Sequence, residues 1–134
     1  MTNGLRILYG DQGDADGGDL FDTTVPPGAY DPVARVGWIT RNGSFTWLNR
    51  TGTMDLNKIV MKAVPSMPGQ YKVQIKGKDG SYAGNTSNLP VHAIVAIDRP
   101  FAATGQCGEW RFPATPPARP SCVANATGTM VKCH

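Results

Sequence analysis

The sequence is poor in charge and has no long apolar run. Charged residues make up 17% of the 134 residues, the net charge is +3, and no run of Lys or Arg stands out. Nucleic-acid binding needs a basic cluster, so we expect no nucleic-acid partner. No stretch approaches the roughly 18 apolar residues that a membrane-spanning helix requires, so we expect no membrane span either.

The residues that usually carry catalysis are also scarce. The two histidines are far apart, with His92 inside an apolar run and His134 at the last position, and they form no metal triad. Ser44, His92 and Asp98 could be combined on paper, but no G-x-S-x-G sequence accompanies them. The Gly-rich segments lack the G-x-x-x-x-G-K-S/T order of a phosphate-binding loop. We therefore expect that the chain is not an enzyme.

Helix-forming runs of Leu, Glu and Ala are missing, whereas Gly and Pro, at 16 and 11 residues, are abundant. This composition favours many short strands joined by turns. The length suits one domain spanning residues 1–134. We predict an all-β fold, an immunoglobulin-like or related β-sandwich of about seven to nine strands with Greek-key connections.

Two segments carry the clearest strand patterns. Residues 71–76 alternate apolar and polar side chains, and residues 91–97 are apolar almost throughout, which is typical of a strand near the middle of a sheet. Residues 58–64 form another predicted strand, with a short helix over Met54 to Lys62 as the alternative. Much of the core is expected from Tyr71, Val73, Ile75, Val91, Ala93, Val95 and Ile97.

Asn42-Gly43 lies between two segments of alternating pattern and predicts a two-residue hairpin turn, because both central residues of a type I′ turn need positive φ. In that hairpin Trp38 lies opposite Trp47. An exposed pair of indoles would stack on sugar rings, whereas a buried pair would belong to the core; the small number of Trp residues favours the core. The candidate residues for a carbohydrate-stacking platform are Trp38, Trp47, Tyr82 and Trp110.

An acidic loop follows the predicted first strand at residues 5–9. Asp14, Asp16, Gly17 and Asp19 have a D-x-D-G-x-D spacing that resembles the calcium-binding loops of EF-hand-like and thrombospondin-type repeats. The bidentate Glu of the EF-hand is absent, and a solvated acidic turn without an ion is the alternative. The candidate Ca²⁺ ligands are Asp11, Asp14, Asp16, Asp19 and Asp22.

All three cysteines lie in the last quarter of the chain, in a segment rich in Pro and Gly, which favours an oxidising compartment. A hairpin over residues 121–133 would place Cys122 opposite Cys133, whereas a hairpin at the preceding proline-rich turn would place Cys107 opposite Cys122. We expect Cys107–Cys122, because that bridge would clamp the proline-rich turn.

Several segments in order, namely the Asn-Gly hairpin with its Trp pair, PGQYKVQIKGKDGSY, NLPVHAIVAID, ATGQCGEWRFP, PSC and GTMVKC, resemble the C-terminal β-rich modules of secreted proteins from environmental bacteria. The resemblance implies an extracellular module of immunoglobulin-like or related shape, and it implies no catalytic residue.

Two functions follow as hypotheses. The first is a non-catalytic extracellular module that binds a polysaccharide or a cell surface. The second is a structural subunit of an extracellular filament, surface layer or virion that associates with itself through an exposed strand edge.

Overall fold

The computed structural model describes residues 4–11, 19–52, 55–78, 91–97, 107–113, 117–126 and 130–134. Within these residues all regular secondary structure is strand, so the predicted all-β class is confirmed. The ten strands are β1 (Leu5–Asp11), β2 (Asp19–Val25), β3 (Val36–Arg41), β4 (Ser44–Asn49), β5 (Leu56–Ala63), β6 (Tyr71–Gly77), β7 (Val91–Ile97), β8 (Cys107–Phe112), β9 (Cys122–Ala124) and β10 (Val131–Cys133). The alternative of a helix over Met54 to Lys62 is wrong, because β5 occupies most of that range. Among the described residues, no helix is long and apolar enough to cross a membrane.

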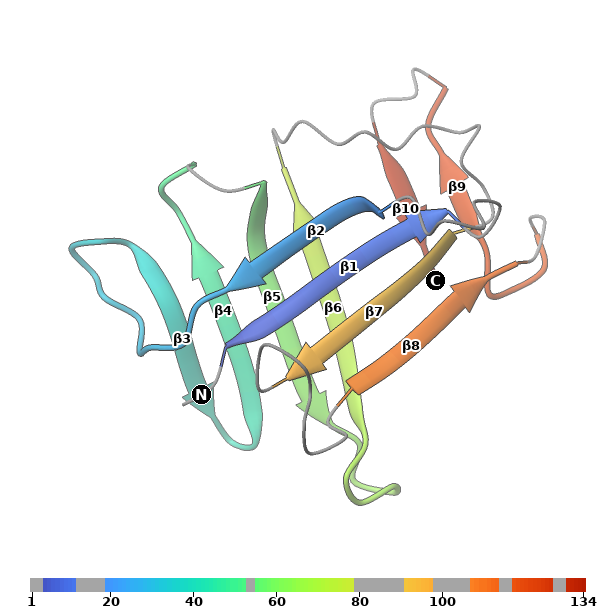
Figure 1. The fold of residues 1–134 in the computed structure, drawn as a ribbon. Helices are drawn as coiled ribbons and strands as arrows, with labels where there is room; N and C mark the ends of the chain where they lie inside the picture. Colours follow the sequence, from blue (N-terminus) through green and yellow to red (C-terminus); the bar gives the residue numbers. More distant parts are fainter. Residues whose placement is uncertain are drawn as a thin grey trace. The chain divides into compact units, whose positions relative to one another are not determined.

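The strands form two four-stranded sheets and one two-stranded sheet, and every pairing between strands is antiparallel (Figure 1). The strand orders are β2-β1-β7-β8, β3-β4-β5-β6 and β10-β9. This content is consistent with a β-sandwich. The finer immunoglobulin-like topology stays a prediction.

The chain forms two compact units. The first, which we call the meander unit, comprises Met1–Asn3 and Pro26–Ser81 and contains β3 to β6. The second, which we call the terminal unit, comprises Gly4–Val25 and Tyr82–His134 and contains the other strands. The single domain over residues 1–134 therefore stays a prediction, and each unit is described by itself below.

In the meander unit, the predicted Asn42-Gly43 hairpin is confirmed. Both residues have positive φ, 47° and 71°, and Trp38 pairs with Trp47 across β3 and β4. Trp38 is 3% exposed and Trp47 is 0% exposed, so the pair is buried. The buried apolar side chains of this unit are Trp38, Trp47, Leu56, Ile59 and Met61.

Strand β6 contributes less to the core than its alternating pattern indicates. Tyr71 is 43% exposed and Ile75 is 36% exposed, so the expectation that they supply the core is wrong. These side chains are exposed because β6 is the last strand of its sheet and only β5 lies beside it. The Tyr71 ring still approaches Phe45, with ring centroids 6.2 Å apart.

In the terminal unit, β7 lies between β1 and β8, which confirms the predicted inner position of residues 91–97. Of its predicted core residues only Val91 is fully buried, while Ala93, Val95 and Ile97 are half-buried. Among the described residues of this unit, the other buried apolar side chains are Leu5, Ile7, Val25 and Cys122.

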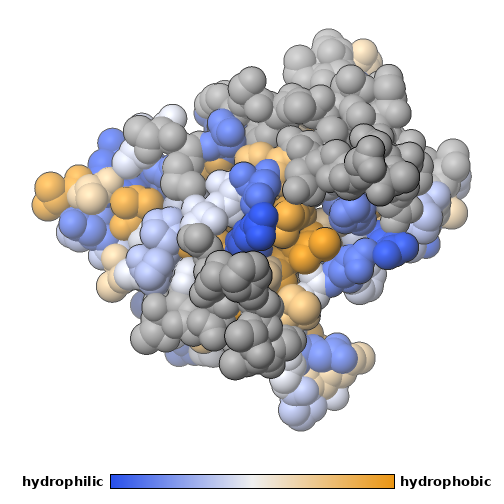
Figure 2. Space-filling view, viewed as in Figure 1, coloured by the Kyte–Doolittle hydropathy of each residue, from blue (hydrophilic) through white to orange (hydrophobic). Residues whose placement is uncertain are grey.

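Strand β2 was not expected, because its sequence DLFDTTV reads as the end of an acidic loop. Its pairing with β1 places Val25 opposite Leu5, and Arg6 donates to both carboxylate oxygens of Asp22 at 2.9 and 2.6 Å. On the face seen in Figure 2, apolar surface lies between hydrophilic areas. On the other side of β1, the register pairs Leu8 with Ile94 of β7.

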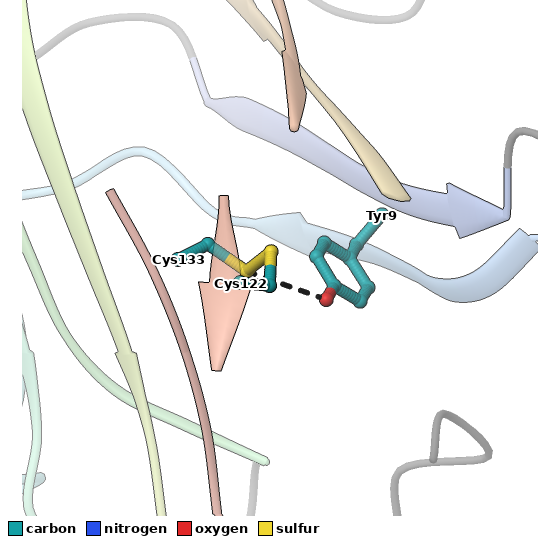
Figure 3. Close-up of a disulfide and its surroundings, with 3 residues drawn as sticks. All are labelled: Tyr9, Cys122 and Cys133. Atoms are coloured by element: carbon teal, nitrogen blue, oxygen red, sulfur yellow. Dashed lines mark hydrogen bonds between the residues drawn. A yellow bond between two sulfur atoms is a disulfide. The ribbon is translucent and has the colours of Figure 1, made fainter. Parts of the chain in front are cut away.

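The disulfide joins Cys122 to Cys133 and leaves Cys107 as an exposed free thiol, so the expected Cys107–Cys122 bridge is wrong. The register explains the outcome, because Cys122 and Cys133 are direct partners on β9 and β10 with their Cα atoms 4.0 Å apart. Cys107 instead pairs with Ala96 of β7. In Figure 3 the hydroxyl of Tyr9 points toward this disulfide, 3.7 Å from Cys133 Sγ.

A lysine face as the candidate functional site

The candidate site is built by the hairpin of β5 and β6. The turn between them closes with hydrogen bonds from Val64 N to Gln70 O and from Gln70 N to Met67 O, at 2.9 and 3.0 Å. Side chains alternate along β5, with Ile59 and Met61 buried on one face. The opposite face of β5 and β6 carries the lysines.

The register of this hairpin places lysines directly opposite each other. Lys58 pairs with Lys76 and Lys62 pairs with Lys72, and all four side chains are exposed. Directly opposed residues have Cβ atoms about 5 Å apart, so each pair juxtaposes two like charges, an arrangement that destabilises a sheet. Lysines on the edge strand β6 oppose pairing with another chain, but this role does not require lysines opposite them on β5.

The same face continues onto β4 and β3. Ser44 lies beside Lys62, and Arg41 lies beside Ser44, so one row across the sheet holds three cations. We call the five cations of this surface the lysine face. They are Arg41, Lys58, Lys62, Lys72 and Lys76.

None of the positions that the strand pairings place on the lysine face is acidic. The positions that separate the cations are polar or apolar, and they are Gly37, Ile39, Ser44, Thr46, Leu48, Val60 and Gln74. In the described part of the chain no ion pair involves any of the five cations. Within the described residues, these five cations therefore carry positive charge that no ion pair balances.

The sequence between residues 26 and 81 concentrates the positive charge of the chain. It holds eight Lys or Arg against three Asp, a net charge of +5, whereas the rest of the chain holds five against seven, a net charge of −2. The modest net charge of +3 for the whole chain hides this division.

Chemically, the lysine face is a flat array of hydrogen-bond donors. Each ammonium group offers three donors on a flexible stem, and Gln74, Thr46 and Ser44 add neutral groups that can donate or accept. Such a surface can bind carboxylate, sulfate or phosphate groups.

The predicted aromatic platform is not assembled. Trp38 and Trp47 are buried and cannot stack on an exposed sugar, which corrects their assignment as ligand-binding residues. Their register makes them opposite neighbours on one face of the sheet, and burial selects the core alternative. Trp110 is exposed on β8, in the terminal unit, and Tyr82 lies outside the described residues.

The predicted calcium ligands are only partly described. Asp14 and Asp16 lie outside the described residues, and Asp11 and Asp19 are described only as residues of β1 and β2. The carboxylate of Asp22 accepts hydrogen bonds from Arg6. Across the described ranges, no three His, Cys, Asp or Glu side chains gather as a metal site. The calcium hypothesis stays a prediction.

The lysine face was not predicted because its cations form no basic run along the chain. A usable signal was present. Lys58 and Lys62 are four residues apart on one strand, and Lys72 and Lys76 repeat that spacing on the next. Residues four apart on a strand share a face, so a hairpin between the two strands brings all four together.

Comparisons of the sequence with protein families and with curated proteins, and of the fold with solved structures, find no match.

Proposed function

We propose that the chain is a non-catalytic extracellular module that binds carbohydrate, and that its ligand is an acidic polysaccharide held on the lysine face. The observation that carries the proposal is the pair of opposed lysines, Lys58 with Lys76 and Lys62 with Lys72, on a face without acidic residues. A polyanion placed between the opposed ammonium groups would relieve their repulsion.

The geometry suits a linear polymer with regularly repeated charges. The two lysine pairs lie four residues apart along the strands, about 13 Å at the usual rise of an antiparallel strand. Between the pairs lie Gln74 and Val60, with Thr46 beside them, so a sugar ring there would meet an amide, a methyl-bearing surface and a hydroxyl.

Nucleic acid is the competing polyanion. Single strands are bound by aromatic side chains next to basic ones, and phosphate groups are often gripped by the paired donors of Arg. The lysine face has no aromatic side chain among its described positions, and Arg41 is its one guanidinium group. These features favour the polysaccharide. The disulfide of Cys122 and Cys133 supports an oxidising, extracellular location.

The test is a titration of the protein with alginate, a polyuronate, and with neutral dextran as the uncharged reference. The test variants are the doubles Lys58→Gln/Lys76→Gln and Lys62→Gln/Lys72→Gln. At roughly 1 kcal/mol for each lysine next to an anionic surface, each double should weaken binding about 30-fold. Binding should also weaken as salt rises, and less steeply in the variants.

The matched control is Arg119→Gln/Lys132→Gln, which removes two exposed cations from the terminal unit and should bind alginate as the wild type does. The length of the alginate chains should not change during incubation. Absence of alginate binding would contradict the proposal, as would equal losses in control and test variants. Tighter binding to a DNA duplex or to anionic vesicles than to alginate would identify that polyanion, and not the polysaccharide, as the ligand of the lysine face.

A further inference from the structure

Strand β8 is an edge strand that carries a large exposed apolar side chain. It pairs with β7 on one side, and no pairing occurs on its other side in the described part of the chain (Figure 1). Trp110, in the middle of β8, is 62% exposed. An exposed edge with an apolar side chain is a template for pairing with another strand.

The two faces of β8 differ in character. Trp110 pairs with Ala93 and Phe112 pairs with Val91, so both aromatic rings lie on the face that buries Val91. The opposite face carries Glu109 and Arg111, which form an exposed ion pair with 2.8 Å between Arg111 Nε and Glu109 Oε1. One face of β8 is therefore apolar. The other face carries a negative charge just before Trp110, at Glu109, and a positive charge just after it, at Arg111.

We propose that two copies of this chain pair through the free edges of β8, antiparallel and with two-fold symmetry about Trp110. In this register Trp110 lies opposite Trp110 of the second copy, and Glu109 lies opposite Arg111 of the second copy. Phe112 lies opposite Gly108 of the second copy, where the space beyond the glycine is open for the ring.

The charged side chains of β8 and the difference between its two faces favour this register over the neighbouring ones. A pairing centred on Glu109 opposes two carboxylates, and a pairing centred on Arg111 opposes two guanidinium groups, both of which are unfavourable. A shift by one residue places Trp110 opposite a charged side chain and mixes the two faces. The register centred on Trp110 avoids all three conflicts.

The two edges of the meander unit, β6 and β3, fit a second copy less well. Strand β6 carries Lys72 and Lys76, and lysines on an edge oppose pairing. The edge of β3 is occupied by the preceding segment, because Trp38 N donates to Gly28 O and Tyr30 N donates to Trp38 O, both at 2.9 Å. The β8 pairing lies in the terminal unit and does not depend on the proposed ligand of the lysine face.

A two-fold pairing uses the β8 edge of both copies, so it closes after two chains and produces a dimer. Six residues on each side bury far less than the about 1,600 Å² of a standard interface, so the dissociation constant should lie in the micromolar range or above. Sedimentation equilibrium should therefore cover about 10 μM to 1 mM protein. The Cys107→Ser variant serves as the parent, because it cannot form a bridge between chains and keeps Cys122–Cys133.

Charge exchange tests the register. Glu109→Arg and Arg111→Glu should each raise the dimer dissociation constant about tenfold or more, because each opposes like charges twice. An equimolar mixture of the two variants should recover a heterodimer of parental affinity, and the double variant Glu109→Arg/Arg111→Glu should recover the homodimer. Unchanged melting temperatures of the dissociated variants confirm that they are folded.

A parent that is monomeric up to about 1 mM would overturn the proposal. A dimer that Glu109→Arg leaves intact would place the interface elsewhere, and a mixture that fails to associate would exclude the register centred on Trp110. Recovery in both the mixture and the double variant would establish it.

Discussion

At the scale of single residues, Trp38 and Trp47 are opposite neighbours whose indole nitrogens have different surroundings. Trp38 Nε1 donates to Pro26 O at 2.9 Å. Trp47 Nε1 is buried and has no hydrogen-bond partner in the described part of the chain. A buried donor without a partner costs free energy, so the two indoles should contribute differently to stability.

Phe substitutions separate the two contributions. Trp38→Phe and Trp47→Phe remove the same atoms from buried sites, but only the first removes a hydrogen bond and leaves a carbonyl without its donor. We expect Trp38→Phe to lower the free energy of unfolding by about 1 kcal/mol more than Trp47→Phe. Urea unfolding of both variants measures the difference. An equal or larger loss in Trp47→Phe would contradict it.

The stability of the fold should depend on pH through Tyr9. Burial raises the pKa of its phenol above the ordinary value of 10.0. Because the folded pKa lies above the unfolded one, the stability linked to the neutral phenol is complete below about pH 10 and is lost as pH rises through the folded pKa. Stability should thus fall less steeply above pH 10 in Tyr9→Phe than in the wild type. Tyr71→Phe, which removes an exposed phenol, is the control and should follow the wild type.

At the scale of elements, the hairpin of β9 and β10 is short and depends on its disulfide. Each strand has three residues, and Cys122 and Cys133 are 11 residues apart. Closing a loop of this length contributes about 3 kcal/mol in the chain-entropy model. Cys133→Ser should lower the free energy of unfolding by about that amount. Cys107→Ser should leave it unchanged because that thiol is exposed and unbridged. Equal effects of the two substitutions in denaturant titrations would refute the assignment of the disulfide to Cys122 and Cys133.

Elements with strong local signals could be predicted from the sequence. Asn42-Gly43 specifies its own turn, and the turn then fixes the register that opposes Trp38 and Trp47. The apolar run at residues 91–97 likewise indicates an inner strand. In each case the information lies within a few residues of the element.

Features that depend on distant partners could not be predicted. Strand β2 has no apolar alternation of its own and exists because β1 lies beside it. Cys122 had two candidate partners, and only the strand register distinguishes Cys133 from Cys107. The opposed lysines required the register of β5 and β6 across a turn, which no motif in that turn specifies.

At the scale of the whole molecule, the opposed lysines of the lysine face should lower the stability of the fold while they provide the charge for binding. Lys62 and Lys72 oppose each other, so Lys72→Glu would convert a repulsive pair into an attractive one. We expect this substitution to raise the free energy of unfolding by about 0.5 kcal/mol. It should weaken alginate binding about 30-fold, as Lys62→Gln/Lys72→Gln does, because both changes remove two units of positive charge. Thermal unfolding and alginate titration of the same sample test both effects. A Lys72→Glu variant that loses stability, or that binds alginate as the wild type does, would contradict the role of Lys72 on the lysine face.

The placement of the meander unit within the chain also sets an order of assembly. Strands β3 to β6 pair only with their neighbours in sequence, so this sheet can form as soon as its last strand has left the ribosome. The ladder of β1 and β7, in which Leu5 lies opposite Ile97, must wait until the whole intervening segment has been synthesised. Contacts between distant residues form slowly, so amides of β4 and β5 should gain protection from hydrogen exchange before those of β1 during refolding. Until β7 has been synthesised, the edge of β1 that β7 later covers has no strand partner, and an unpaired strand edge favours aggregation.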